Sequence, residues 1–288
     1  MDAEKNKTEG GTLYLVGTPI GNLADLSPRA IKVLSEVTFL AAEDTRNTRK
    51  LLTCAGIHTG DLVSYHEHNK KASGERILAR LLTGDSCALV TDAGMPAISD
   101  PGEDLVRLCA GAGIPVTVIP GPCAAVSALA LSAQATGRFC FEGFLPTARG
   151  ERDARIRALQ TEERTTILYE APHRLLRTLE ALCEGLAEDR GISLCRELTK
   201  RNEEVMRTTL GEALAYYREH EPRGEYVLVL AGATHVPEKE ENTAMFSLPP
   251  EEHVRVYEER GMSRMDAIKA AAKDRGMTKS ELYKLLLQ

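Results

Sequence analysis

The chain has 288 residues, of which 43% are hydrophobic and 27% are charged, and its formal net charge at pH 7 is −6. This composition is typical of a globular protein and excludes global disorder. The acidic balance argues against a protein that coats nucleic acid indiscriminately, and the length predicts about two domains.

The ends of the chain and its cysteines predict a cytoplasmic protein without membrane or metal. Residues 1–11 are polar and lack the apolar core of an export signal, and no window reaches the roughly 18 apolar residues of a membrane span. The seven cysteines form no CxxC pair and no histidines cluster around them. Reduced thiols therefore fit better than a zinc site or a disulfide framework.

The first part of the chain alternates short apolar runs with helical patterns. Ser27 followed by Pro28 predicts a helix start, with an N-cap residue and a proline in the first turn. The alternation predicts a largely parallel sheet with helices on its faces. The predicted strands span residues 13–16, 38–42, 62–65, 87–91 and 116–119, with helical stretches at 77–82 and 105–112.

A Pro-Gly-Pro sequence at 120–122 interrupts this rhythm and predicts a domain boundary. A helix of small residues follows, and then the alternation resumes up to residue 230. We therefore predict an α/β protein with a flexible N-terminus at 1–11 and two α/β domains, at 12–120 and 121–232. The predicted elements of the second domain are the helix at 123–132 and strands at 139–144, 166–169, 192–195 and 226–230.

The remaining residues predict a linker and a small helical extension. Residues 233–250 are polar and include a charged run, whereas 251–288 have helical periodicity. Ser263 and Thr278 each have an acidic residue three positions on, which is the spacing of a capping box. From 264 to 284 there are six Lys or Arg and three Asp or Glu, so this part is net +3 within an acidic chain.

Three loops rich in glycine or proline follow predicted strands, at residues 17–22, 91–102 and 120–128. Loops at the carboxyl ends of parallel strands are where open α/β sheets bind ligands, and glycine allows a close approach of the backbone. Asp92 or Asp100 could hydrogen-bond a ribose or an amine. Tight turns with side-chain caps, and close helix packing, remain the alternatives. Cys123 fits a small buried residue better than a nucleophile.

Polar clusters follow four further strands, which indicates a site assembled from loops. An ion-pair network is the alternative for the first cluster. A metal site at His66 and His68 is disfavoured. The clusters lie at residues 43–46, 65–69, 170–174 and 196–200.

Nine segments, taken in order, resemble the bacterial ribosomal small subunit methyltransferase I family, whose members are tetrapyrrole-methylase-type enzymes that use S-adenosylmethionine (SAM). The resemblance spans about residues 11–232 and continues into the tail around 267–283. The segments are LYLVGTPIGNL, AAEDTR, SYHEHN, TDAGMPAISDPG, PGPCAAVSAL, FEGFLP, YEAPHR, RELTK and GEYVLVLAG.

This resemblance implies two α/β domains with SAM in the cleft between them, a homodimer, and 2′-O-methylation of a cytidine ribose in the decoding region of 16S rRNA within the small ribosomal subunit. Met95 stands where the family has a small hydroxyl residue, so only backbone contacts are expected there. Residues 202–206 are also less apolar than usual. The implied cofactor-binding residues are Gly17, Asp92, Ala93, Gly94, Met95, Ile98, Cys123, Ala124, Tyr169, Leu198 and Glu225.

A ribose hydroxyl is a poor nucleophile, so a general base and a cation that stabilises the alkoxide are expected. The candidate bases are Glu43, Asp44 and His66, and the candidate cations are Arg46 and Lys200. RNA contact is expected from the basic tail and from an arginine run, unless these are merely solvated helix faces. The arginine run comprises Arg149, Arg152, Arg155 and Arg157.

Other functions stay open at this point. A tetrapyrrole or a modified histidine on a protein could be the substrate of the same fold. The chain could instead be a non-catalytic nucleotide-binding module whose tail docks a partner, and binding of SAM rather than a nucleoside triphosphate would separate the two. A DNA-binding helix-turn-helix protein is disfavoured by the acidic net charge.

Overall fold

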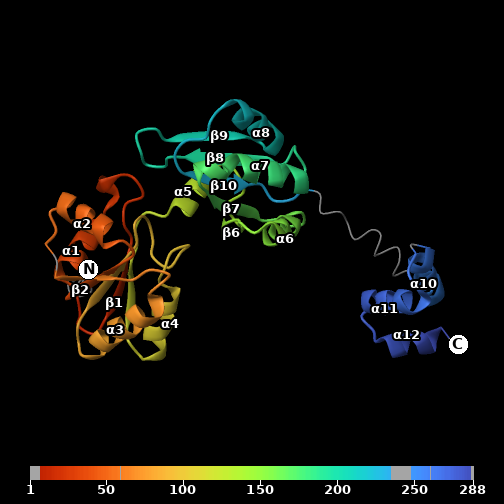
Figure 1. Cartoon of the computed structure of the whole chain (residues 1–288), viewed down its shortest axis with the longest axis horizontal. Coiled ribbons are helices and arrows are strands. Elements are labelled where there is room, and N and C mark those ends of the chain that lie inside the picture. Colours follow the sequence, from red (N-terminus) through yellow and green to blue (C-terminus); the bar gives the residue numbers. More distant parts are fainter. Residues whose placement is uncertain (1–6, 59, 235–247, 260, 287–288) are drawn as a thin grey trace. The chain divides into compact units, whose positions relative to one another are not determined.

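The computed structural model describes residues 7–58, 60–234, 248–259 and 261–286 (Figure 1). The chain forms two compact units, Met1–Gly232 and Ala233–Gln288. Within the first unit lie two five-stranded sheets, each with its own helices. The predicted boundary near Pro120 falls between the last strand of the first sheet and the helix that precedes the second.

The first sheet is entirely parallel, with the strand order β3-β2-β4-β1-β5. Two of its three inner strands consist of the apolar runs FLAA and CALV, and every residue of both is buried, as expected for strands covered on both faces. The predicted parallel sheet is therefore confirmed for this half. Its strands are β1 (Leu13–Val16), β2 (Phe39–Ala42), β3 (Asp61–Ser64), β4 (Cys87–Val90) and β5 (Val116–Ile119).

Helices cover both faces of this sheet. Val33, Leu34 and Leu52 pack in a core on one face, and Ile77 and Leu105 pack in a second core on the other. The ligand-binding edge of such a sheet is the one where the parallel strands end. The short helix is η2 (Leu23–Asp25), and the α-helices are α1 (Pro28–Glu36), which Ser27 caps as predicted, α2 (Thr45–Cys54), α3 (Lys70–Leu82) and α4 (Glu103–Gly111).

The second sheet is mostly antiparallel, with the order β6-β7-β10-β8-β9. Only β6 and β7 run parallel, so the expectation of parallel strands is wrong for this half. β8 and β9 are joined by a short loop, which only an antiparallel pair permits, and β10 pairs with both β7 and β8. The strands are β6 (Phe139–Phe144), β7 (Thr165–Glu170), β8 (Gly191–Arg196), β9 (Glu204–Thr209) and β10 (Tyr226–Leu230).

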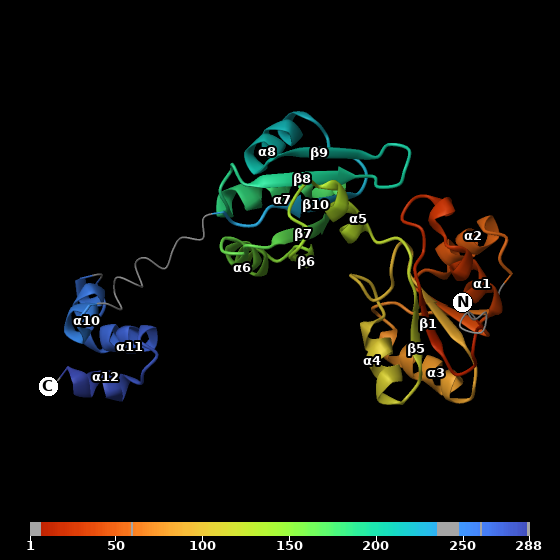
Figure 2. The ribbon, with the colours of Figure 1, turned by 180° about the vertical axis from the view of Figure 1, so that it is seen from behind.

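The two faces of the second sheet are covered differently (Figure 2). One face carries a large leucine-rich core that includes Leu175 and Leu214. The other face packs against α5, whose Ala125 and Ala128 lie on Val227 and its neighbours. Small side chains let this helix approach the strands closely. The helices are α5 (Ala124–Leu131), α6 (Arg149–Leu159), α7 (Pro172–Gly185) and α8 (Leu210–Glu219).

The described part of the second unit contains three short helices around a small core. α10 (Pro250–Glu259), α11 (Arg264–Asp274) and α12 (Lys279–Leu285) bury residues such as Ile268 and Leu282. Thr278 and Glu281 form the predicted capping box at the start of α12. Most of the predicted linker, 235–247, lies outside the described residues. None of the helices in the described residues is both long and apolar enough to span a bilayer.

Candidate functional site

The three glycine- and proline-rich loops lie side by side where the strands of the first sheet end. The Thr18 amide donates to the Gly94 carbonyl at 2.9 Å, and the Gly94 amide donates back to Thr18 at 3.2 Å. A Cβ atom added to Gly17 would lie 2.7 Å from the Cα atom of Gly121. Glycine is required at these positions because the backbones nearly touch.

Two loops that face this region carry strained backbone. Ala97 and Ser99, after β4, have φ angles of 67° and 65°, and Glu197 and Thr199, after β8, have φ angles of 53° and 66°. Residues other than glycine seldom adopt this left-handed conformation, and it persists where the surroundings enforce it, often at ligand sites.

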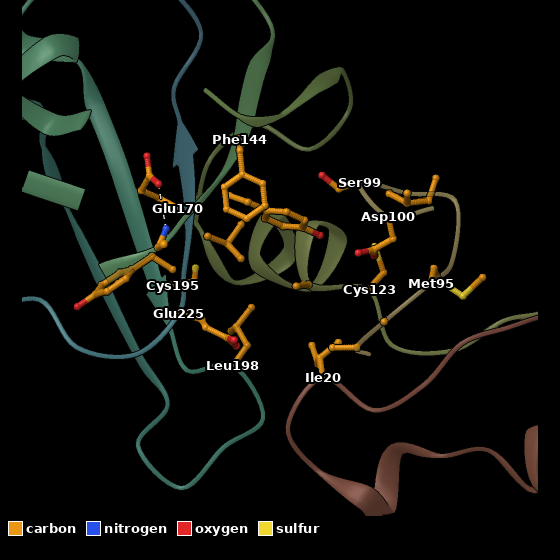
Figure 3. A pocket seen from close by; sticks show the side chains of 18 of the residues that line it. Ile20, Met95, Ser99, Asp100, Cys123, Phe144, Glu170, Cys195, Leu198 and Glu225 are labelled. Atoms are coloured by element: carbon orange, nitrogen blue, oxygen red, sulfur yellow. Dashed lines mark hydrogen bonds between the residues drawn. The ribbon is translucent and has the colours of Figure 1, made fainter. Parts of the chain in front are cut away.

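The loops enclose a cavity of about 420 Å³, which is in the usual size range for small-molecule sites. Figure 3 shows Ser99 and Asp100 facing Phe144, Leu198 and Glu225 across it. Nine of the eleven predicted cofactor-binding residues line this cavity, which both α/β halves build. They are Ala93, Gly94, Met95, Ile98, Cys123, Ala124, Tyr169, Leu198 and Glu225.

The other two predicted residues lie outside the lining. Gly17 is behind the Met95 side chain, because a Cβ at Gly17 would lie 2.7 Å from the Met95 sulfur. The Asp92 carboxylate instead accepts a hydrogen bond from the Asn47 amide at 2.8 Å. The lining also includes Asp100, which the sequence suggested only as a possible partner of a ribose or an amine. The lining residues outside all of these predictions are Ile20, Ser99, Phe144, Glu170, Ala171, Pro172, Cys195, Tyr226 and Val227.

One wall of the cavity is organised around Tyr169. Its ring lies edge-on to Phe141 at 5.0 Å and to Phe144 at 5.6 Å. Its hydroxyl oxygen accepts a hydrogen bond from the Ala125 amide, in the first turn of α5, at 3.2 Å. Burial raises the pKa of the Tyr169 hydroxyl to about 12, so it stays protonated. Tyr169 thereby joins β7 to the start of α5.

Replacing Tyr169 by Phe is expected to lower the free energy of unfolding by about 1 kcal/mol, because the Ala125 amide loses its acceptor. Denaturant unfolding measures this. Tyr216→Phe is the control, since Tyr216 lies on the exposed part of α8 and stacks on His220. Equal stabilities of the two variants would contradict the role assigned to the Tyr169 hydroxyl.

The cavity lining contains three carboxyl groups and neither lysine nor arginine. The Glu170 carboxylate lies 3.3 Å from the Arg174 guanidinium, and the Glu225 carboxylate 2.8 Å from the Lys200 ammonium. Asp100 forms no ion pair with any described residue. Burial, together with the nearby charges of Glu43 and Asp92, raises its pKa to about 7. A cavity with such an uncompensated carboxyl group suits a ligand that carries positive charge.

The predicted general bases differ in how readily they can accept a proton. Burial, followed by the Asp92 charge, raises the pKa of Glu43 above its ordinary value. His66 lies close enough to interact with Glu43, and its Nδ1 atom is buried without a partner among the described residues. The Asp44 carboxylate caps α2 and binds Arg46 at 2.7 and 3.1 Å, which holds its pKa well below the usual range. Asp44 is therefore a weak proton acceptor.

The Lys200 ammonium donates to Glu197 at 2.9 Å and to Glu225 at 2.8 Å, so two carboxylates balance its charge. His66 and His68 lie on a turn, because β3 already ends at Ser64. Their rings lie edge-on 6.0 Å apart. Across the described ranges, no three His, Cys, Asp or Glu side chains cluster in a way that could hold a metal ion.

Comparison with known proteins defines the class of enzyme to which the fold belongs. Residues 12–214 match the family model for Tetrapyrrole (Corrin/Porphyrin) Methylases. The fold resembles uroporphyrin-III-C-methyltransferase from Thermus thermophilus, with a TM-score of 0.55 and 23% identity over 77% of this chain and 94% of that one. It also resembles a cobalt precorrin-4 methyltransferase, with a TM-score of 0.56 and 15% identity over 80% and 97% of the two chains. The fold is that of a tetrapyrrole-type methylase.

Curated relatives narrow the class, and each of them is called ribosomal RNA small subunit methyltransferase I. The protein from Synechocystis sp. is 46% identical over 278 residues, which are 96% of this chain and 98% of that one. The Bacillus subtilis protein is 45% identical over 96% and 94%, and the Escherichia coli O157:H7 protein is 49% identical over 77% and 78%. The chain belongs to the ribosomal RNA small subunit methyltransferase I family of tetrapyrrole-type methylases.

Proposed function

We propose that this protein transfers the methyl group of SAM to the 2′-oxygen of a cytidine ribose in the decoding region of 16S rRNA, within the small ribosomal subunit. The observation that carries the proposal is the cavity in a chain of this family: both α/β halves wall it, main-chain atoms line it, and it contains no lysine or arginine. The family relatives named as rRNA methyltransferases support RNA as the substrate.

The residues present fit SAM. The methyl donor is a sulfonium, whose positive charge favours carbonyl and carboxylate oxygens and disfavours nearby cations. Asp100 supplies a carboxylate, and Glu225 supplies a second one that Lys200 also binds. The loop at Gly94 presents its backbone to the cavity, because Gly94 has no side chain. Leu198, Val227 and Phe144 provide apolar and aromatic surface for an adenine ring.

When bound, SAM supplies an electrophilic methyl group that is transferred by in-line displacement. The chain must hold the ribose hydroxyl on that line and exclude water from it. Glu43 is the favoured proton acceptor, because its raised pKa makes it a better base than Asp44, and His66 is positioned to take up or orient the proton. Arg46 is exposed and lies at the start of α2, where it can contact a phosphate.

Glu43→Gln and His66→Ala are each expected to lower turnover by about a hundredfold while SAM binding persists, as for the loss of a general base. The assay incubates the full chain with radiolabelled SAM and unmodified small subunits, and then maps the labelled ribose. Calorimetry with SAM measures cofactor binding in parallel. Wild-type turnover in both variants would show that neither Glu43 nor His66 acts in proton transfer. Radiolabel on a base or on a protein would contradict the proposed ribose substrate.

The basic surfaces predicted from the sequence differ in how much of their charge is free. On α6, Arg149 lies 3.5 Å from Asp153, and Arg155 lies 3.0 Å from Glu142, so these charges are largely compensated. In the second unit, the ion pairs described involve only His253 and Arg264. The lysines of α11 and α12 thus carry free charge, which supports RNA contact there. The homodimer and the cytoplasmic location remain predictions from the resemblance and the sequence.

A further inference from the structure

A second cavity, of about 690 Å³, runs along the free edge of the first sheet. β3 is the outermost strand of that sheet, and it lies between α2, which packs on one face, and α3, which packs on the other. The lining comes from both helices and from β3 itself. We call it the α2–α3 groove and define it by Arg49, Thr53, His58, Asp61, Arg76 and Arg80.

The groove gathers positive charge that the protein itself does not neutralise. Arg80 is held in place by Asp85 at 2.8 Å and Asp61 at 3.4 Å, with its guanidinium 3.8 Å above the Phe39 ring. Arg49 and Arg76 are exposed and form no ion pair with any described residue. Salt-bridge partners are therefore available to only one of the three arginines.

The surrounding segment is basic within an acidic chain. Residues 45–82 contain seven Lys or Arg and three Asp or Glu, which is net +4, whereas the whole chain is −6. Of the three acidic residues, Asp61 pairs with Arg80 and Glu67 pairs with Lys70. Asp44 and Asp85, just outside this segment, pair with Arg46 and Arg80. The cations of the segment without an ion pair among the described residues are Arg49, Lys50, Lys71 and Arg76, and this unpaired charge favours a polyanion site over a solvated helix face.

Two kinds of polymer could lie along a sheet edge: a nucleic-acid backbone, or a peptide that adds a strand. β3 has only four residues and begins at Asp61, and the Arg80 side chain reaches Asp61. Short edges carrying charged side chains are poor templates for strand addition. Free guanidinium groups, in contrast, bind phosphate oxygens well, often in bidentate fashion.

The groove is also connected to the cofactor cavity through α2. Asn47, in the first turn of α2, contacts Asp92 at 2.8 Å, and Asp92 lies in the loop whose following residues line the cavity. Arg49 and Thr53 lie further along the same helix, whose ten residues span about 15 Å. A strand whose target ribose lies at the cavity could therefore place a phosphate a few nucleotides away in the groove.

We propose that the α2–α3 groove binds phosphodiester groups of the RNA strand that carries the target ribose, through Arg49 and Arg76. This rests on the proposed function in RNA methylation. The groove would be a second RNA-binding site, remote from the reacting atoms, that contacts the phosphate backbone of the RNA and makes no contact with its bases.

The test compares the wild type with Arg49→Ala/Arg76→Ala in the full chain. The ligands are a fluorescent single-stranded decoding-region oligonucleotide and unmodified small subunits, titrated at several KCl concentrations. We expect the affinity for the oligonucleotide to fall about tenfold at moderate salt. The slope of log affinity against log salt concentration should decrease in magnitude by about 1.4, which corresponds to the loss of two contacts with single-strand phosphates. Arg49→Lys/Arg76→Lys keeps both charges and should keep the slope.

Arg177→Ala/Arg218→Ala is the matched control, since it removes two exposed charges from α7 and α8. It should bind RNA as the wild type does, and SAM affinity measured by calorimetry should be the same in every variant. If the alanine pair at 49 and 76 keeps the wild-type slope while the wild type methylates subunits, the groove proposal alone fails. If that pair changes self-association but not RNA binding, the groove holds protein and the proposal is wrong. If the wild type labels no RNA, the proposed function fails first.

Discussion

Replacing Asp100 by Asn is expected to abolish the increase in SAM affinity that accompanies loss of the Asp100 proton. Asp100 lines the cavity and has no basic partner among the described residues, and its pKa is raised to about 7 by burial and then by the charges of Glu43 and Asp92. Below that pH it is neutral and does not attract a sulfonium. Above it the carboxylate is charged, and SAM should bind about tenfold more tightly.

The neutral product S-adenosylhomocysteine separates this effect from everything else that titrates. Both molecules share the adenosine and the amino acid groups, and they differ in the methyl group and its positive charge. The ratio of their affinities, measured by calorimetry from about pH 5.5 to about pH 8.5, should therefore rise with pH in the wild type and stay constant in Asp100→Asn. A constant ratio in the wild type would show that Asp100 does not face the sulfonium.

The same substitution should stabilise the protein in the absence of SAM. Because the pKa of Asp100 is higher in the folded protein than in the unfolded chain, its protonated form stabilises the fold below the ordinary value near 3.8, and this contribution is lost as the pH rises through about 7. Allowing for partial exposure, we expect Asp100→Asn to raise the free energy of unfolding at pH 8 by about 1–2 kcal/mol. Asp189→Asn, on an exposed turn, should change it little.

The first sheet and its loops could be predicted from the sequence because local signals and global structure agree there. Apolar runs such as Cys87–Val90 are bounded by glycine or proline, and a parallel strand buried on both faces has that pattern. The loops that follow these strands had to lie at one edge of the sheet. Nine of the eleven residues named for the cofactor then line one cavity.

The second sheet could not be predicted to the same extent, because strand direction is set by pairing partners far away in the chain. β10 lies between β7 and β8 although it follows both in sequence, and the edge strand β9, with the sequence EVMRTT, has no fully buried residue and no regular alternation of polar and apolar residues. The environment of Asp100 is likewise invisible in the sequence. Its burial and its lack of a basic partner arise only when Glu43, Asp92 and the two halves are brought together.

Replacing Gly17 by Ala is expected to destabilise the protein by about 3 kcal/mol and to weaken SAM binding at least about tenfold, since overpacking of a tight contact forces the backbone to move. The new Cβ would lie 2.7 Å from the Gly121 Cα atom and 2.8 Å from its amide nitrogen. Neither backbone can yield easily. Gly17 donates to the Ile119 carbonyl at 3.1 Å, and the next residue, Thr18, is hydrogen-bonded to Gly94 in both directions.

Two control variants test whether the loss of stability comes from the contact between Gly17 and Gly121 or from glycine-to-alanine substitution in general. Gly111→Ala is the control, because a Cβ there meets nothing within 4 Å and α4 ends at this residue. Met95→Ala combined with Gly17→Ala removes the sulfur that would lie 2.7 Å from the new methyl group but leaves the clash with Gly121. We expect that double variant to recover little stability in denaturant unfolding. Full recovery would mean that the Met95 side chain, rather than the contact between the two glycine backbones, requires glycine at position 17.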